Sequence, residues 1–484
     1  MSDLRTNSSV AVDLQVELSR DSPVPLHRQI ENAIRGAIRS GELRGESSLP
    51  PTRTLAAAIG VSRGVVVEAY QQLTSEGYLT SRSGGYTRVR SGLDTVPVAA
   101  PATLAPPAGI DFKYCRPDVT RFPRTAWLRS VRRVLNETPD EALAYSGGRG
   151  APQLRVALAD YLNRARGTTA DPENVLICNG FTQAITLLSQ VLAHRGARRM
   201  AVEDPSDPEI RAVPLAAGIE VVGVPVTSEG MDVAALIRSD ADVVLLTPAH
   251  QCPTGAVLPA GARAAVLEWA RQRGALVIED DYDTEYRYDR APIGAMQGLA
   301  PDHVVYAGTA SKTLMPGLRL GWLVAPLSLV EDLTAAKEIA DRGSPVFDQL
   351  AFADFLARGE LDRHLRRMRP VYRRRRDALL DSLRARLPDL RPTGISAGLH
   401  LAAWLPPDLD DTEVVVAAAH RGLRVHGLAP YRLTGSGDPG LIFGYASLTE
   451  PTIAEGIAIL ADVIATLRST PTVAGHLPEV GRDP

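Results

Sequence analysis

The sequence predicts an α/β protein with two domains, a small helical domain at the N-terminus and a large domain built on a mostly parallel sheet. A chain of 484 residues is too long for one ordinary hydrophobic core. Residues 91–109 contain four prolines, many alanines and no aromatic residue, which is typical of an extended linker. After this stretch, short apolar runs alternate with helical patterns, as in a parallel sheet covered by helices.

Shifts in composition place the domain boundaries. The two ends of the chain are polar and lack a periodic apolar pattern, so we expect disordered tails there. The predicted segments are a tail over 1–19, a helix-rich domain over 20–90, a linker over 91–109, a large domain over 110–470 and a tail over 471–484.

Composition also argues against several classes of protein. The net charge is −3, so any nucleic-acid site must be a local feature. Cys115, Cys178 and Cys252 are odd in number and widely spaced, without a disulfide framework or a CxxC metal motif. We therefore expect a reducing, cytoplasmic environment and no metal site. The N-terminus lacks an apolar signal core and no run of 18 residues is apolar, so we expect no membrane contact.

The N-terminal domain has the pattern of a helix-turn-helix. Apolar residues recur every four positions in the first predicted helix: Leu26, Ile30, Ile34 and Ile38. A short helix over about 53–59 would end at Gly60, and the hydroxyl of Ser62 can cap the helix that follows. SRSGGYTRV then predicts a short hairpin between Leu79 and Val89.

This pattern suits a small helical interaction domain as well as a DNA-binding domain. The DNA-binding interpretation depends on Arg53, Arg63 and Gly64. A recognition helix reads bases with its first turn, where Arg63 can donate bidentately to guanine and Gly64 allows close approach. Three further arginines flank the hairpin, where phosphates would lie: Arg82, Arg88 and Arg90.

The domain closely resembles the winged helix-turn-helix of GntR-type transcription regulators. The resemblance covers about 70 residues and rests on LPPTRTLA, GVSR, AYQQL and GYL, in that order. It implies double-stranded operator DNA as a partner, contacted by Arg53, Ser62, Arg63, Gly64 and Gly85. At the wing tip, SGGY stands where the family usually has GSGT.

In the large domain, residues 308–322 read GTASKTLMPGLRLGW and keep a lysine, although only three of the 53 basic residues are lysines. Lys312 follows the apolar run HVVYAGT, and two other runs, DVVLLTPAH and ALVIEDD, also end in polar residues. Ligands of open α/β sheets bind at such carboxyl ends of strands. A P-loop is rejected because Ser311 and Ala307 stand where it requires glycine.

Two interpretations of Lys312 remain, a solvent-exposed lysine and a Schiff-base lysine. The second would account for the neighbouring residues. Thr309, Ser311 and Arg319 can bind a phosphate, and Asp280 can bind a pyridinium nitrogen.

The stretch resembles the pyridoxal-phosphate lysine motif of fold-type I aminotransferases. Together with the N-terminal domain, the chain resembles MocR/GabR-type regulators over about residues 20–470. The supporting motifs are AYSGGRGAPQLR, EDPSDP, TPAHQCPTG, IEDDYDTEYRYD, GTASKTLMPGLRLGW and GLHLAAWLP. The resemblance implies the fold-type I architecture with large and small subdomains, pyridoxal 5'-phosphate (PLP) as cofactor, and a homodimer with shared sites.

The resemblance also implies roles for single residues. Lys312 would form the Schiff base, Asp280 would bind the pyridine nitrogen and Tyr282 the phenolic oxygen. Tyr145 resembles the tyrosine that reaches the cofactor phosphate of the other subunit.

The cofactor phosphate would be held by a larger set. Arg319, Thr309 and Ser311 would supply side chains, and Gly180 and Phe181 would supply backbone N–H groups at a helix N-terminus. Apart from the resemblance, CNGFTQAI is equally typical of a plain helix-capping turn.

The sequence departs from the aminotransferase pattern beside the cofactor. Asp207 replaces the aromatic residue that stacks on the ring, and Cys252 replaces the asparagine that contacts the phenolic oxygen. His250 and Gln251 are alternative sources of that contact, and Cys252 otherwise suits a buried apolar position.

A third departure concerns the substrate. Ile442 stands where aminotransferases carry the arginine that binds the substrate carboxylate, with Arg432 as a candidate substitute. Because transamination needs a substrate held in a reactive pose, these losses favour sensing over turnover.

We therefore expect a PLP-dependent transcription regulator without catalytic residues. Its signal would be PLP itself, as in family members that control vitamin B6 synthesis, or a PLP adduct of an amine or amino acid. The alternatives are an active aminotransferase with an appended DNA-binding domain and a body that has lost its cofactor.

Overall fold

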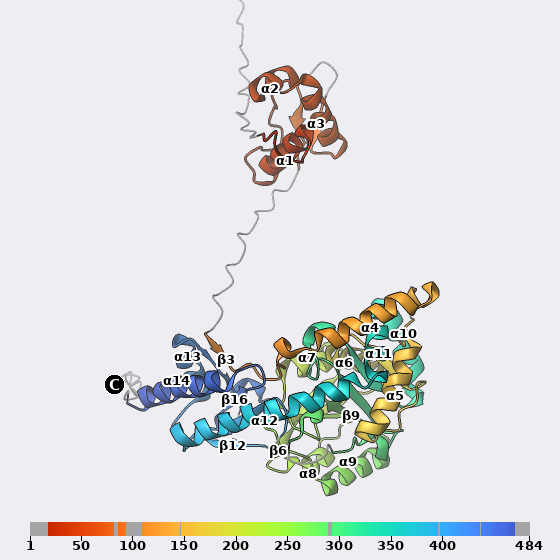
Figure 1. Ribbon diagram of the computed structural model, residues 1–484, viewed down its shortest axis with the longest axis vertical. Helices are drawn as coiled ribbons and strands as arrows, with labels where there is room; N and C mark the ends of the chain where they lie inside the picture. The colour runs from red at the N-terminus through yellow and green to blue at the C-terminus, as the bar shows by residue number, and fades with distance from the viewer. Residues whose placement is uncertain are drawn as a thin grey trace, which may run out of the picture. The chain divides into compact units, whose positions relative to one another are not determined.

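The computed structural model describes residues 18–81, 86–92, 109–145, 147–288, 293–394, 397–435 and 437–469. The chain divides into two compact units, residues 1–106 and 107–484 (Figure 1). Nearly all of the predicted linker and tails lies outside the described residues, as do Arg82 and Gly85 at the predicted wing tip.

The N-terminal unit contains three helices and a short hairpin. Its elements are α1 (Leu26–Arg39), α2 (Thr52–Ile59), α3 (Arg63–Ser75), β1 (Leu79–Thr80) and β2 (Arg88–Val89). The two strands are antiparallel, with Leu79 opposite Val89. The predicted apolar faces of α1 and α3 form a common core, which includes Ile30, Ile34, Ile38, Val66, Tyr70 and Leu73.

The turn between α2 and α3 is made by Gly60, whose backbone is left-handed (φ 66°, ψ 38°). Glycine adopts this conformation without steric penalty, so the chain can enter α3 two residues later. Ser62 occupies the N-cap position of α3, but its hydroxyl makes no capping hydrogen bond. The predicted serine cap is therefore wrong. Instead, the Val65 N–H donates to the backbone carbonyl of Ser62 at 3.1 Å, and the exposed Ser62 side chain can be hydrated.

The large unit is built on an eight-stranded sheet in the order β4-β11-β10-β9-β8-β5-β6-β7. Strands β6, β5, β8, β9 and β10 are parallel, whereas β11 is antiparallel to both its neighbours and β7 to β6. The three predicted strands are the neighbours β8, β9 and β10, so their carboxyl ends meet at one edge. The strands are β4 (Val175–Cys178), β5 (Arg199–Asp204), β6 (Glu220–Thr227), β7 (Gly230–Met231), β8 (Val243–Leu246), β9 (Leu276–Asp281), β10 (Val304–Thr309) and β11 (Gly321–Val324).

Every residue of β4, β8, β10 and β11 is buried, as expected for a sheet that is covered by helices on its faces. The predicted helix over 260–272 is α9 (Ala260–Arg273). The other helices of this part are α4 (Arg124–Glu137), α5 (Pro152–Arg166), α6 (Phe181–His194), α7 (Pro208–Ala216), α8 (Val233–Arg238), α10 (Leu327–Asp341) and α11 (Val346–Ala357). Short 3-10 turns lie at Val119–Arg121, Asp140–Leu143, Thr284–Tyr286, Gln297–Leu299, Pro316–Leu318 and Ala429–Tyr431.

A smaller antiparallel sheet, in the order β12-β13-β16-β15, forms a second part of the large unit. The long helix α12 (Glu360–Arg386) runs from the large sheet to this part (Figure 1). The remaining elements are β12 (Arg391–Thr393), β13 (His400–Trp404), α13 (Asp411–His420), β14 (Leu423–Arg424), β15 (His426–Gly427), β16 (Gly440–Gly444) and α14 (Glu450–Ser469). Within the described ranges, no helix is long and apolar enough to cross a membrane.

The first strand of the large unit, β3 (Ile110–Asp111), is fixed to this second part. It pairs in parallel with β14, placing Ile110 opposite Leu423. The Phe112 N–H then donates to the Arg424 carbonyl at 2.9 Å, and the fully buried Phe112 ring packs edge-on against Phe443. The chain therefore enters the large unit at a firmly held point.

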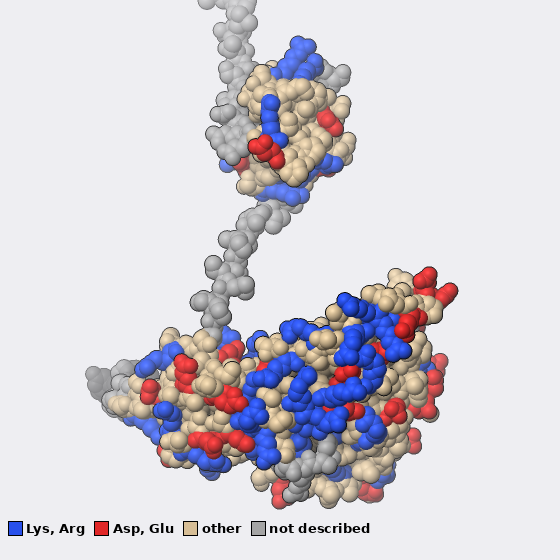
Figure 2. All heavy atoms as spheres, in the orientation of Figure 1, with Lys and Arg blue, Asp and Glu red and all other residues tan. Residues whose placement is uncertain are grey.

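Basic side chains gather on one face of the large unit, over α12 and α4 (Figure 2). Acidic groups hold several of them in place. Glu360 pairs with Arg363 of α12 at 3.0 Å and lies 3.7 Å from Arg129 of α4. This surface is therefore a local basic feature in a chain whose net charge is −3.

Candidate functional site

The carboxyl ends of β9 and β10 open into a cavity of about 490 Å³. Most of the residues predicted to bind a cofactor line it, although they come from three separate segments. They are Phe181, Asp280, Tyr282, Thr309, Ser311, Lys312 and Arg319. Gly180 directly precedes Phe181, whereas Tyr145 does not line the cavity.

Asp280 carries a buried oxygen, Oδ1, that has no hydrogen-bond partner among the described residues. Burial raises the pKa of its carboxyl group well above the ordinary value, and the charge of Asp281 adds to this, whereas Lys312 opposes it. A buried oxygen without a partner is unfavourable, so the site suits a ligand that brings a donor and a positive charge. A protonated pyridine nitrogen meets both requirements.

Lys312 lies after β10, half-buried in the cavity wall. No hydrogen bond or ion pair engages its amine among the residues the structure describes. Lys337 differs, because it is fully buried and its amine is bound by Asp341 at 2.6 Å. Lys312 therefore presents an unoccupied primary amine to the cavity.

Another part of the cavity wall suits an anion. Gly180 is the N-cap residue of α6, so the first N–H groups of this helix point outward beside it. Arg319 lies against this turn, where its Nη2 donates to the Asn179 carbonyl at 2.8 Å. Thr309 and Ser311 are joined by a 3.2 Å hydrogen bond from the Ser311 N–H to the Thr309 hydroxyl. A phosphate placed here would meet a helix N-terminus, a guanidinium and two hydroxyls.

Gly180 is required at this turn for two reasons. Its φ is 82°, and a Cβ at this position would lie 2.7 Å from Nη2 of Arg319. We expect Gly180→Ala to displace the guanidinium and to weaken the binding of a phosphate-bearing ligand such as PLP about tenfold, the loss of roughly one hydrogen bond to a charged group. Fluorescence titration with PLP measures the change.

The matched control is Gly196→Ala at the other end of α6. Gly196 also has a positive φ, 98°, but a Cβ there meets no atom within 4 Å. Equal weakening in both variants would show that backbone strain, and not displacement of Arg319, is the cause.

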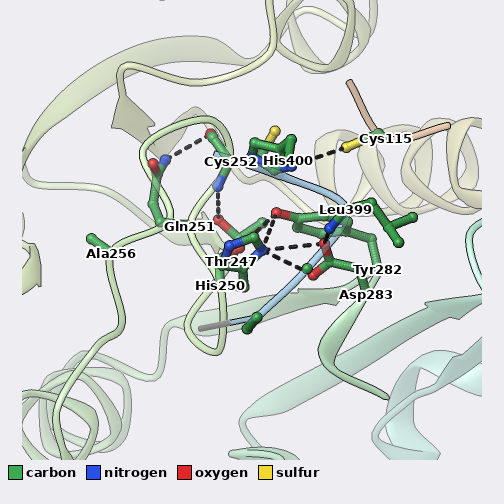
Figure 3. Close-up of polar contacts among 12 residues, drawn as sticks. Cys115, Thr247, His250, Gln251, Cys252, Ala256, Tyr282, Asp283, Leu399 and His400 are labelled. Carbon is green, nitrogen blue, oxygen red and sulfur yellow. Dashed lines mark hydrogen bonds and ion pairs between the residues drawn. The ribbon is translucent and has the colours of Figure 1, made fainter. Parts of the chain in front are cut away.

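Tyr282 belongs to a hydrogen-bond network beside the cavity (Figure 3). Its hydroxyl donates to the His250 carbonyl at 2.8 Å and lies 3.1 Å from His250 Nδ1. His250 Nδ1 in turn lies 3.1 Å from Asp283, and the His400 ring stacks on Tyr282. Because His250 Nδ1 is already engaged by Tyr282 and Asp283, we interpret the cluster as an internal hydrogen-bond network. The role of Tyr282 toward the cofactor stays a prediction.

Tyr145 is 86% exposed. Tyr145 does not line the cavity of its own chain. Its predicted role, contact with the cofactor of a second subunit, stays a prediction.

The residues that depart from the aminotransferase pattern fall into two groups. Asp207 and Cys252 line the cavity. Asp207 caps α7 through a 2.9 Å bond from the Glu209 N–H, and its other oxygen lies 3.3 Å from the Tyr114 hydroxyl. Gln251 is engaged elsewhere, since its amide donates to the Pro205 carbonyl at 2.9 Å.

Ile442 and Arg432 lie outside the cavity lining. Ile442 is fully buried in β16, and Arg432 donates to the Asp438 carbonyl. Arg432 therefore does not replace the missing carboxylate ligand in this structure.

Several lining residues were missed from the sequence. Tyr114 and Cys115 follow β3 directly, and Arg211 lies on α7. Glu203 is the next-to-last residue of β5, where burial raises the pKa of its carboxyl group to about 7. The run KYCR directly after the linker combines aromatic, thiol and basic side chains, and this was the available signal.

The residues predicted to bind DNA lie at the N-terminal ends of α2 and α3. Arg53, Ser62, Arg63 and Gly64 are all exposed. Arg63 Nε donates to the Thr52 hydroxyl over 3.4 Å, which links the starts of the two helices. A Cβ on Gly64 would meet no atom closer than 3.9 Å, so the surface there is open.

Each of the two units matches a known protein family. Residues 117–434 match aminotransferase class I and II, and residues 26–89 match the bacterial regulatory proteins of the gntR family. The pyridoxine biosynthesis transcriptional regulator PdxR of Corynebacterium glutamicum is 33% identical over 460 residues, covering 94% of this chain and 99% of that protein. The chain belongs to the MocR/PdxR-type transcriptional regulators. A second relative of this MocR-type regulator is the probable rhizopine catabolism regulatory protein MocR of Rhizobium meliloti, 32% identical over 476 residues, with coverage of 94% and 96%.

Solved structures resemble the large unit of this MocR-type regulator. LysN, an α-aminoadipate aminotransferase of Thermus thermophilus complexed with N-(5'-phosphopyridoxyl)-L-leucine, has a TM-score of 0.68 and 29% identity, covering 74% of this chain and 92% of that chain. The kynurenine aminotransferase of Pyrococcus horikoshii has a TM-score of 0.69 and 25% identity, with coverage of 75% and 92%. The predicted fold class, a GntR-type unit followed by an aminotransferase-like unit, is confirmed.

Proposed function

We propose that the large unit of this regulator binds PLP, and that its occupancy changes how the N-terminal unit binds operator DNA. The observation that carries the proposal is the arrangement of three unlike groups around one cavity. These are the unoccupied amine of Lys312, the partnerless oxygen of Asp280, and the α6 N-terminus with Arg319.

Each group has a task that follows from its chemistry. When bound, PLP supplies an aldehyde, which condenses with a primary amine. Lys312 would hold the ligand covalently, and Asp280 would keep the ring nitrogen protonated. Arg319, Thr309, Ser311 and the α6 N-terminus would bind the phosphate.

Binding without turnover is favoured by what surrounds the cavity. Ile442 and Arg432 do not line it, and the guanidinium of Arg211 is engaged by backbone carbonyls, including that of Ser206 at 2.6 Å. The arginine that usually fixes an amino-acid carboxylate is thus replaced by Ile442, and Arg116, which also lines the cavity, is an exposed side chain on the segment after β3. Efficient transamination requires a substrate held in a fixed pose. We propose PLP itself as the signal, in keeping with the relative PdxR, a transcriptional regulator of pyridoxine biosynthesis.

We further propose that the regulator acts as a homodimer. The support is Tyr145, which is exposed and outside the cavity of its own chain. In a two-fold symmetric dimer each Tyr145 would approach the other subunit's cavity, so each site would need both chains.

Operator binding with and without PLP tests the function. We would first select DNA fragments from a random library with the full-length protein, and then measure their affinity in both states. We expect PLP to change the affinity by about 5- to 150-fold, the usual range of coupling between two sites. Equal affinities with and without PLP would contradict the proposal.

A second measurement separates the regulator from an active aminotransferase. PLP-loaded protein is incubated with a panel of amino acids, and keto acid is followed over time. We expect no sustained production. Steady turnover would assign the cavity to catalysis.

A further inference from the structure

Two of the three cysteines of this chain meet in the wall of the cavity. Cys115 comes from the segment after β3, and Cys252 from the turn after β8, so they are far apart in the sequence. Figure 3 shows both beside the ring of His400. The third, Cys178, is fully buried in β4. Because two of only three cysteines line the same cavity, we considered whether their thiols react with each other.

The surroundings hold the two thiols in place. The Cys115 Sγ lies 3.8 Å from Nδ1 of His400. The Cys252 N–H donates to the Thr247 hydroxyl at 3.1 Å, which fixes its backbone. Cys115 has a left-handed backbone with φ 54°, which is uncommon for a residue other than glycine. Strained positions of this kind gather at functional sites.

The pair is also polarised. The hydrogen bond from Cys252 lowers the pKa of Cys115 well below its ordinary value, and the positive charges of His400 and Lys312 act in the same direction, against the effect of burial. The same bond and burial raise the pKa of Cys252. Nearby Asp207 and Asp283 add to that rise. Cys115 is therefore the more acidic of the two thiols.

We propose that Cys115 and Cys252 form an oxidation site, at which a peroxide converts the two thiols into a disulfide. The Cys115 thiolate attacks one oxygen of hydrogen peroxide and the O–O bond breaks, which leaves Cys115 as a sulfenic acid. The departing hydroxide takes up the proton that Cys115 had lost to His400 and becomes water. The Cys252 sulfur then attacks the Cys115 sulfur, and its proton leaves with the hydroxyl group as a second water. One peroxide is thus reduced to two waters as two thiols become one disulfide.

The disulfide would alter the cavity in which the ligand binds. Both sulfurs share the wall with Lys312 and Asp280, so joining them draws two lining segments together. We expect oxidised protein to take up PLP more weakly, and bound PLP to slow the oxidation. These two consequences rest on the proposed function, whereas formation of the disulfide does not.

Thiol counting tests the disulfide without any cofactor. Full-length protein is treated with hydrogen peroxide, denatured in a thiol-blocking reagent and weighed by mass spectrometry. We expect the three thiols of each chain to fall to one, within a single chain, and to return with dithiothreitol. Cys115→Ser and Cys252→Ser should form no disulfide, and the control Cys178→Ala should lose both of its remaining thiols. Three thiols after treatment, or links only between chains, would overturn the proposal.

The control is suitable because burial raises the pKa of Cys178 to about 12, which leaves this thiol unreactive. A second variant, His400→Gln, tests the positioning role of the histidine. We expect it to shift the pH profile of Cys115 alkylation to higher pH. An unchanged profile would remove His400 from the site.

Uptake of PLP by reduced and oxidised protein completes the test. If reduced protein binds no PLP, the proposed function fails while the thiol count still decides the disulfide. If both forms bind PLP equally, the oxidation site does not act on the cavity, and its proposed consequence is wrong.

Discussion

Lys312→Ala is expected to abolish two properties of the PLP-loaded regulator, its visible absorption band and the response of its DNA binding to PLP. The band reports a covalent bond between the aldehyde and a lysine amine. Two lysines line the cavity: Lys312, half-buried directly after β10, and Lys113, exposed on the segment after β3. Lys337 does not line it and is buried against Asp341. We assign the bond to Lys312 because its charge acts on the Asp280 carboxyl group. Absorption spectra and operator titrations with added PLP measure both losses.

Lys312→Arg is the matched variant for this prediction. Arginine keeps the positive charge but offers no primary amine, and its guanidinium stays protonated. We expect the same loss of absorption as in Lys312→Ala. A retained band in either variant would mean that another amine binds the aldehyde, and the assignment of Lys312 would fall.

Arg63→Ala is expected to weaken operator binding by about 1–3 kcal/mol, which is roughly 5- to 150-fold, because a bidentate contact to guanine contributes that much to base discrimination. Arg63 is exposed at the first position of α3, on the open surface beside Gly64. Affinity for operator and for unrelated DNA, measured at one fixed salt concentration, separates base reading from phosphate attraction.

Arg28→Ala serves as the control for Arg63→Ala. Arg28 is also an exposed arginine of the N-terminal unit, but it lies on α1 and pairs with Glu31 at 3.2 Å. We expect the control to bind operator nearly as the native protein does. If Arg63→Ala weakened operator and unrelated DNA equally, Arg63 would be a phosphate contact and not a base contact.

The sequence predicted those elements whose structure depends on their own residues, such as apolar strands and a glycine turn. The apolar runs of β8, β9 and β10 are buried on both faces, so their strands could be recognised without knowing their neighbours. Gly60 ended α2 as predicted, because a left-handed turn favours glycine. The Ser62 cap failed, since a serine at the N-cap position can leave its hydroxyl to solvent.

The candidate site was predictable where one segment carries several of its groups. Thr309, Ser311, Lys312 and Arg319 share one short stretch, and their meeting with Asp280 follows from the parallel pairing of β9 and β10. Tyr114 and Cys115 could not be placed in this way. They reach the cavity only because β3 pairs with β14, more than 300 residues further along the chain. A two-residue strand leaves no periodicity by which its partner can be found.

That same pairing has a mechanical consequence. Residue 109 precedes β3, whereas Tyr114 and Cys115, which line the cavity, follow it within five residues. Because β3 is bonded to β14 and Phe112 is embedded against Phe443, this span is pinned to the small sheet. A rigid rotation of the small sheet would therefore move both the cavity wall at Tyr114 and Cys115 and residue 109, the last residue of the predicted linker. The small sheet thus links the ligand cavity, through Tyr114 and Cys115, to residue 109, where the linker joins the large unit.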